Sequence, residues 1–156
     1  MLTSLLQTIV AIGLGLSVQW ASANYGTDDP YARGNCYRWG EWPQMEDGWR
    51  LPTAEEFDEL MVQCKWEWHQ GGNGVVAHYR VTGPSGEAII LPAAGYQAVE
   101  KSVSEGKWGY LWSSSNDDLM KDDGRGITFG GNGQYRWYSG SHSFQFPIRL
   151  VRTLSE

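Results

Sequence analysis

The pattern of apolar and polar positions along this chain predicts one helix among many short strands. Apolar side chains within residues 57–64 recur at the i, i+3, i+4 and i+7 spacing, so they share one face of a helix. Thr53 can accept a hydrogen bond from the first helical turn, and Glu56 can reach back to complete a capping box. We therefore expect one clear amphipathic helix at about residues 53–64.

Short strand-like runs, separated by turns rich in Gly, Asn, Asp and Pro, fill much of the remaining chain. A strand is expected to begin near residue 65, and the others cover residues 75–81, 88–91, 109–113, 127–129, 135–138 and 146–151. The pattern predicts an α+β fold of short antiparallel strands and long loops. A chain of 156 residues is expected to close around one core and form a single domain.

The first apolar segment has two interpretations. It ends in Ala-Ser-Ala at residues 21–23, which resembles the cleavage site of a signal peptide, but residues 1–8 contain no Lys or Arg. Alternatively, residues 12–20 alternate between apolar and polar side chains as the first strand of the domain. We favour the strand, and expect the domain to cover residues 12–152 after an N-terminal extension at 1–11. The apolar run is too short for a membrane span.

Composition and charge narrow the possible partners. Only 19% of the residues are charged and the net charge is −6, so the basic face of a nucleic-acid-binding protein is missing. The chain contains 9 Trp, 8 Tyr and 20 Gly residues, which predicts an aromatic core with glycine-rich turns. This composition is common in extracellular binding domains.

Seven short motifs carry a resemblance to a known family. They are Leu-Gly-Leu-Ser-Val-Gln-Trp-Ala at 14–21, Tyr-Arg-Trp-Gly-Glu at 37–41, Trp-Arg-Leu-Pro-Thr at 49–53, Val-Thr-Gly-Pro-Ser-Gly at 81–86, Ile-Leu-Pro-Ala-Ala-Gly-Tyr at 90–96, Leu-Trp-Ser-Ser-Ser at 111–115 and Phe-Pro-Ile-Arg-Leu-Val at 146–151. In this order they resemble FISUMP domains, the major paralogous domains of bacterial surface proteins. The resemblance implies a C-type lectin-like fold and a location at the bacterial cell surface or outside the cell.

The same resemblance extends to formylglycine-generating enzymes and to the variable proteins of diversity-generating retroelements. The enzymes use a cysteine pair or bound copper late in the domain, whereas Cys36 and Cys64 both lie in the first half of this chain. No Gly-x-Ser-x-Gly elbow marks a nucleophilic serine. We therefore expect no enzyme activity. The two cysteines could form a disulfide or remain free, and the sequence leaves both alternatives open.

Polar and aromatic residues crowd positions 116–144, as in the binding loops of antibodies. If residues 135–138 form a strand, they point two to each face, and outward aromatic side chains would be interface anchors. The expected ligand-binding residues are Asn116, Asp117, Asp118, Asp122, Asn132, Tyr135, Arg136, Trp137, Tyr138 and His142.

The resemblance makes residues 116–144 the counterpart of the diversified region in the variable proteins, and it makes Trp112 and Arg149 part of the framework. It therefore predicts a non-catalytic recognition module that binds a protein or a glycan. The alternative is a structural or adhesive domain, such as the tip of a pilus or tail fibre.

No cofactor is expected. His69, His78 and His142 lack the close spacing of a zinc site. Acidic residues between Asn116 and Asp123 could offer oxygen ligands to calcium, but the Glu-Pro-Asn and Gln-Pro-Asp signatures of sugar-binding lectins do not occur. For the acidic residues between Asn116 and Asp123 we favour a solvated loop over a calcium site.

Overall fold

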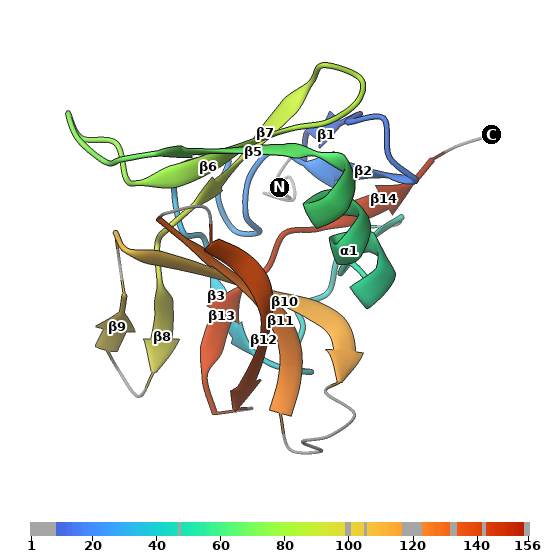
Figure 1. Ribbon diagram of the computed structural model, residues 1–156. Helices are drawn as coiled ribbons and strands as arrows, with labels where there is room; N and C mark the ends of the chain where they lie inside the picture. Colours follow the sequence, from blue (N-terminus) through green and yellow to red (C-terminus); the bar gives the residue numbers. More distant parts are fainter. Residues whose placement is uncertain are drawn as a thin grey trace, which may run out of the picture.

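The computed structural model describes residues 9–46, 48–98, 101–104, 106–116, 123–131, 134–141 and 143–154, with Asn116 and Asp123 described by their backbone alone. Within these ranges the protein has one α-helix and mostly antiparallel strands in four small sheets (Figure 1). The α+β class predicted from the sequence is confirmed.

Two of the sheets have four strands. One has the order β1-β2-β14-β4 and contains β1 (Ala11–Ile12), β2 (Val18–Ala21), β14 (Val151–Thr153) and β4 (Trp49–Arg50). The other has the order β3-β13-β8-β9 and contains β3 (Cys36–Arg38), β13 (Gln145–Pro147), β8 (Tyr96–Ala98) and β9 (Lys101–Val103). Both sheets join strands from distant parts of the chain.

The other two sheets are meanders of three consecutive strands. The first contains β5 (Lys65–His69), β6 (His78–Thr82) and β7 (Ala88–Pro92), and the second contains β10 (Trp108–Asn116), β11 (Asp123–Gly130) and β12 (Gln134–Ser141). In Figure 1 the first meander lies at the top of the molecule and the second below it, with helix α1 (Ala54–Gln63) to one side.

The strand expected over residues 12–20 is only partly correct, because the chain bends within it. Gly15 has a φ of +88°, and a Cβ atom there would lie 2.9 Å from the backbone nitrogen of Ser85. The bend separates β1 from β2 but still buries Leu14 and Leu16. Strand β2 then pairs with β14, so the second half of the expected first strand is part of a sheet.

Three further boundaries differ from the expectation. Strand β6 begins at His78 rather than at residue 75, and the single strand expected over 146–151 is two strands, β13 and β14. The strands expected at 127–129 and 135–138 are present but longer, since β11 and β12 have eight residues each. The short strands β3, β4, β8 and β9 were not predicted.

The capping box predicted for the helix is present. The Glu56 backbone N–H donates to Thr53 Oγ1 at 3.2 Å, and the Thr53 backbone N–H donates to Glu56 Oε1 at 2.9 Å. Arg50 donates two hydrogen bonds of 2.7 Å to the same carboxylate. Burial opposes ionisation of Glu56, but the bonds from Arg50 and Thr53 outweigh it and lower the pKa of Glu56. On the buried face, Phe57 and Leu60 enter the core.

Two clusters of buried apolar side chains form the core. The first contains Trp20, Phe57, Tyr79 and Phe129 and lies between the helix, the upper meander and β11. The second is centred on Trp112, whose ring stacks on Phe146 at a centroid distance of 4.0 Å. The Trp112 indole N–H donates to the carbonyl of Tyr37 at 2.7 Å, so this framework residue also holds β3 in place.

Arg149 lies between β13 and β14 and is completely buried. Its Nε donates to Asn24 Oδ1 at 2.8 Å, its Nη1 to the Ala21 carbonyl at 3.1 Å, and its Nη2 to the Ile90 carbonyl at 2.6 Å. Burial lowers the pKa of Arg149 to about 9, so the guanidinium remains charged at neutral pH. One cation therefore connects β2, β7 and the loop after β2.

We expect Thr53→Ala to lower the free energy of unfolding by about 1 kcal/mol, because the first helical turn loses its cap. Denaturant titration measures this change. Thr53→Ser keeps the hydroxyl and is the matched control, with a midpoint close to that of the parent protein. Equal midpoints for all three proteins would contradict the cap assignment.

We expect Arg149→Ala to destabilise the protein by roughly 3 kcal/mol or more, because three oxygen atoms in and near the core lose their donor and a cavity forms. Arg152→Ala is the control, since Arg152 is only partly buried and bonds the side chain of Gln19. Thermal denaturation followed by circular dichroism compares the two variants. The Arg149 assignment would be wrong if both variants lost the same stability.

Candidate ligand-binding surface

The structure describes four of the expected ligand-binding residues completely. They are consecutive in β12, namely Tyr135, Arg136, Trp137 and Tyr138. Asn116 ends β10 and is described by its backbone. The remaining expected residues, Asp117, Asp118, Asp122, Asn132 and His142, lie outside the described residues. The structure therefore tests the placement of the aromatic half of the predicted site.

The expectation that β12 carries outward aromatic side chains on an uncovered face is wrong. Tyr135 and Trp137 point to one face and pack, partly buried, against the first core cluster. Tyr138 points to the other face and packs against the second cluster. The sheet lies between the two clusters, so each of its faces has apolar neighbours. Of the four residues only Arg136 is classed as exposed.

Trp137 is partly buried and is held by contacts from strand β11 and helix α1. The guanidinium carbon of Arg125 lies 4.0 Å from the centroid of the Trp137 ring. The indole N–H donates to Asp58 Oδ1 at 2.7 Å, and the ring meets Phe57 edge-on at 6.1 Å. Helix α1 and strand β11 thus fix the orientation of this β12 side chain.

The same face continues onto strand β5. The ring of Tyr135 stacks on Trp66 at a centroid distance of 4.2 Å and an interplanar angle of 8°. Trp66 donates its indole N–H to the Leu60 carbonyl at 3.0 Å, and Trp68 donates to Gln70 Oε1 at 3.1 Å. All these rings are half-buried.

We call this surface the aromatic strip, and it consists of Trp66, Trp68, Arg125, Tyr135 and Trp137. Of these five residues, only Tyr135 and Trp137 were among the ligand-binding residues expected from the sequence. The alternation of Trp66 and Trp68 in a predicted strand was a usable signal for a shared face. Nothing local marked Arg125, because its contact with Trp137 arises from the pairing of β11 with β12.

Both cysteines are free thiols, which resolves the alternative left open by the sequence. Cys36 lies in β3 and Cys64 directly follows α1. Burial raises the pKa of Cys36, against the opposing effect of Arg33, and burial with the Glu59 carboxylate raises the pKa of Cys64 to about 11. Each thiol is protonated at neutral pH, which is unfavourable for nucleophilic chemistry.

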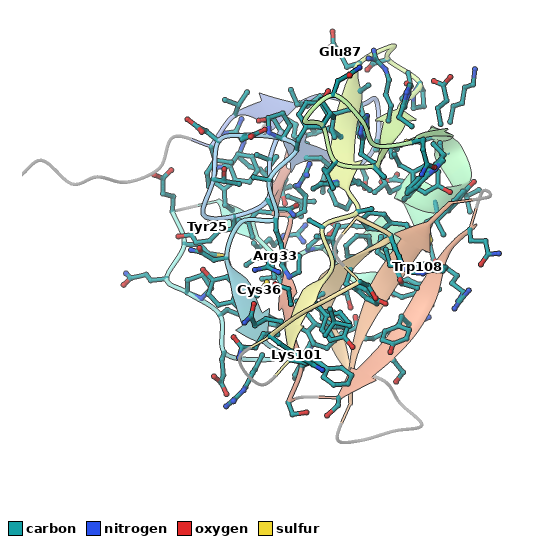
Figure 2. All side chains as sticks on the ribbon, turned by 90° about the vertical axis from the view of Figure 1, so that its left-hand side faces the viewer. Tyr25, Arg33, Cys36, Glu87, Lys101 and Trp108 are labelled. Carbon is teal, nitrogen blue, oxygen red and sulfur yellow. The ribbon has the colours of Figure 1, made fainter. Side chains whose placement is uncertain are left out.

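Two open grooves also lie on the described surface. A polar groove of about 610 Å³ is lined by Arg33, Gly34, Asn35, Cys36, Tyr37, Gln97 and Gln145. Figure 2 shows Arg33 and Cys36 near the middle of the face that is turned to the viewer. A mostly apolar groove of about 500 Å³ is lined by Trp42, Pro43, Met45, Trp49, Arg50, Leu51, Thr53 and Ser114.

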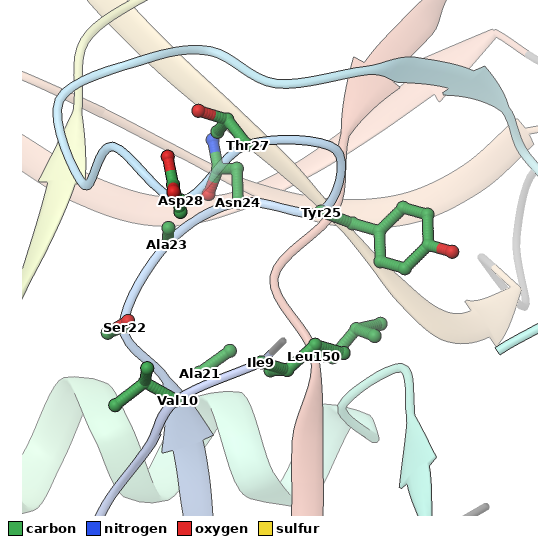
Figure 3. A pocket seen from close by; sticks show the side chains of 10 residues that line it. All are labelled: Ile9, Val10, Ala21, Ser22, Ala23, Asn24, Tyr25, Thr27, Asp28 and Leu150. Atoms are coloured by element: carbon green, nitrogen blue, oxygen red, sulfur yellow. The ribbon is translucent and has the colours of Figure 1, made fainter. Parts of the chain in front are cut away.

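A third, smaller cleft lies beside the chain that follows β2. Its volume of about 30 Å³ has room for little more than a water molecule. Figure 3 shows apolar side chains, including Val10, Ala21 and Leu150, at one end and Asn24 with Asp28 at the other. This cleft is too small for an organic ligand.

Within the described ranges, no group of three or more His, Cys, Asp and Glu side chains is placed to hold a metal ion. The acidic residues considered for calcium fall mainly in 117–122, outside those ranges. No described helix is long and apolar enough to cross a membrane.

Comparison with known proteins returned no matching family model, no matching curated protein and no matching solved structure.

Proposed function

We propose that this chain is a non-catalytic recognition domain that binds a protein or glycan ligand through residues 116–144 and the adjoining aromatic strip. The observation that carries this proposal is the partly buried Trp137 ring, which is fixed by Arg125 at 4.0 Å and by Asp58 at 2.7 Å. Aromatic side chains next to arginine are typical anchors of binding interfaces. A ring that is already oriented loses little conformational entropy when a ligand binds.

The contacts of the strip also support ligand recognition in preference to a purely structural role. Trp66 and Trp68 extend the surface from β12 to β5, so a ligand could contact aromatic rings from two separate sheets. Gln70, Asp58 and Arg125 add hydrogen-bonding and charged groups at its rim. A mixture of rigid rings and polar groups is common in binding surfaces that recognise either proteins or sugars.

We further propose a C-type lectin-like fold of the FISUMP type, displayed at a bacterial surface or secreted. The pairing of β2 with β14 supports this proposal, since it joins the segments near both ends of the domain. The region 116–144 would then be the diversified part of the scaffold. The raised pKa values and separate positions of Cys36 and Cys64 speak against the chemistry of formylglycine-generating enzymes.

A glycan array and a pull-down of bacterial and host surface proteins would identify the ligand. We then expect Arg125→Gln and Trp137→Phe each to weaken its binding by about tenfold, measured by biolayer interferometry. Arg80→Gln is the matched control, because Arg80 is an exposed arginine of β6 and is outside the strip.

Circular dichroism must show that each variant keeps the parent fold. The proposal would be contradicted if the folded Arg125→Gln and Trp137→Phe proteins bound the ligand as tightly as the parent protein does. A stable oligomer in which Trp137 becomes buried would favour the structural or adhesive alternative, and size-exclusion chromatography with light scattering detects it.

A further inference from the structure

A row of polar side chains crosses the sheet β3-β13-β8-β9, and two of them, Gln97 and Gln145, line the polar groove. Gln145 of β13 lies opposite Arg38 of β3 on one side and opposite Gln97 of β8 on the other. Gln97 in turn lies opposite Ser102 of β9. Directly opposed residues of antiparallel strands point to the same face. The four strands therefore present one guanidinium, two amides and one hydroxyl side by side.

Arg33 reaches this row from the loop that precedes β3. Its Nη1 donates to Ser102 Oγ at 2.9 Å and its Nη2 to Gln97 Oε1 at 3.3 Å. Both partners are neutral, and they use two of the five N–H groups of the guanidinium. Neither of the two ion pairs found among the described residues includes Arg33. Arg33 therefore brings a positive charge to the groove without a described carboxylate beside it.

The position of Arg33 is fixed by the buried interior of the protein. The amide nitrogen of Asn24 donates to the Arg33 carbonyl at 3.0 Å, while the Asn24 oxygen accepts from Arg149. At the next residue, Gly34 has a φ of +74°, and a Cβ atom there would lie 2.5 Å from the Tyr25 carbonyl. The loop is thus anchored on both sides of the peptide that follows Arg33, so the groove is largely preformed.

The chemistry of the lining selects a class of ligand. Asn35, Gln97 and Gln145 each offer both donors and acceptors, which suits the hydroxyl groups of a sugar. Arg33 suits a single carboxylate, with which a guanidinium can form two parallel hydrogen bonds. The described lining residues include no Asp or Glu that would repel such a group. The volume of about 610 Å³ falls within the usual range for small-molecule sites.

We propose that this polar groove binds a hexuronate, an acidic monosaccharide unit, with its carboxylate at Arg33 and its hydroxyl groups at Gln97, Gln145 and Asn35. None of the residues of the aromatic strip lines the groove. The site therefore stands apart from the proposed function, and either one can fail without the other.

The experiment titrates the full chain with D-glucuronate at constant ionic strength, with D-glucose and acetate as separate arms. Binding is measured by calorimetry and by protection of thiols from iodoacetamide in mildly alkaline buffer. Cys36 lines the groove and reports on it, whereas Cys64 at the end of α1 is an internal control. We expect saturable glucuronate binding that slows modification of Cys36 and leaves Cys64 unchanged. Glucose and acetate should bind at least about tenfold more weakly.

Two variants and one control test the assigned contacts. Arg33→Gln should reduce glucuronate affinity by about tenfold, as should Gln145→Leu, which removes an amide without touching the charge. Arg80→Gln should bind like the parent protein. The proposal is overturned by absence of saturable binding, by equal affinity for acetate and glucuronate, by equal protection of both cysteines, or by parent-like binding in folded Arg33→Gln and Gln145→Leu proteins.

Discussion

The buried guanidinium of Arg149 is the constraint on which the rest of the structure depends. A charged group in the interior is tolerated only when its hydrogen-bonding capacity is well satisfied. Here the three acceptors are Asn24, Ala21 and Ile90, which come from two distant segments of the chain, residues 21–24 and strand β7. A shift of any one segment would leave a buried cation with a missing partner. The short strands around Arg149 have few ladder hydrogen bonds of their own, so this shared contact helps to set their relative positions.

The two candidate binding surfaces depend on this frame in different ways. The polar groove depends on it directly, because Asn24 bonds Arg149 with its oxygen and the Arg33 carbonyl with its nitrogen. The aromatic strip depends on the packing of α1 against β12, where Asp58 accepts the indole N–H of Trp137. The first surface is polar and carries a guanidinium, whereas the second is built from aromatic rings. The described part of the chain therefore presents two chemically distinct surfaces.

Local signals predicted the elements that depend on neighbouring residues. The helix and its cap were correct because a capping box and an i, i+3, i+4 stripe involve side chains within one or two turns. The meander strands β5–β7 and β10–β12 were also located, although their ends differed. Strands β3, β4, β8 and β9 were missed because they have two or three residues each, too few for a periodic pattern. They exist because distant strands, such as β13 and β14, supply their hydrogen-bond partners.

The sequence by itself determined the α+β class, the capped helix and the prominence of aromatic residues in β12, since these follow from composition and from contacts close along the chain. Only the tertiary structure decided which faces those aromatic residues cover. The strand predicted at 135–138 covers residues 134–141, and its two faces meet two different core clusters. The polar groove likewise could not be read from the sequence, because Arg33, Gln97 and Gln145 are far apart in the chain and meet only when the sheet β3-β13-β8-β9 assembles.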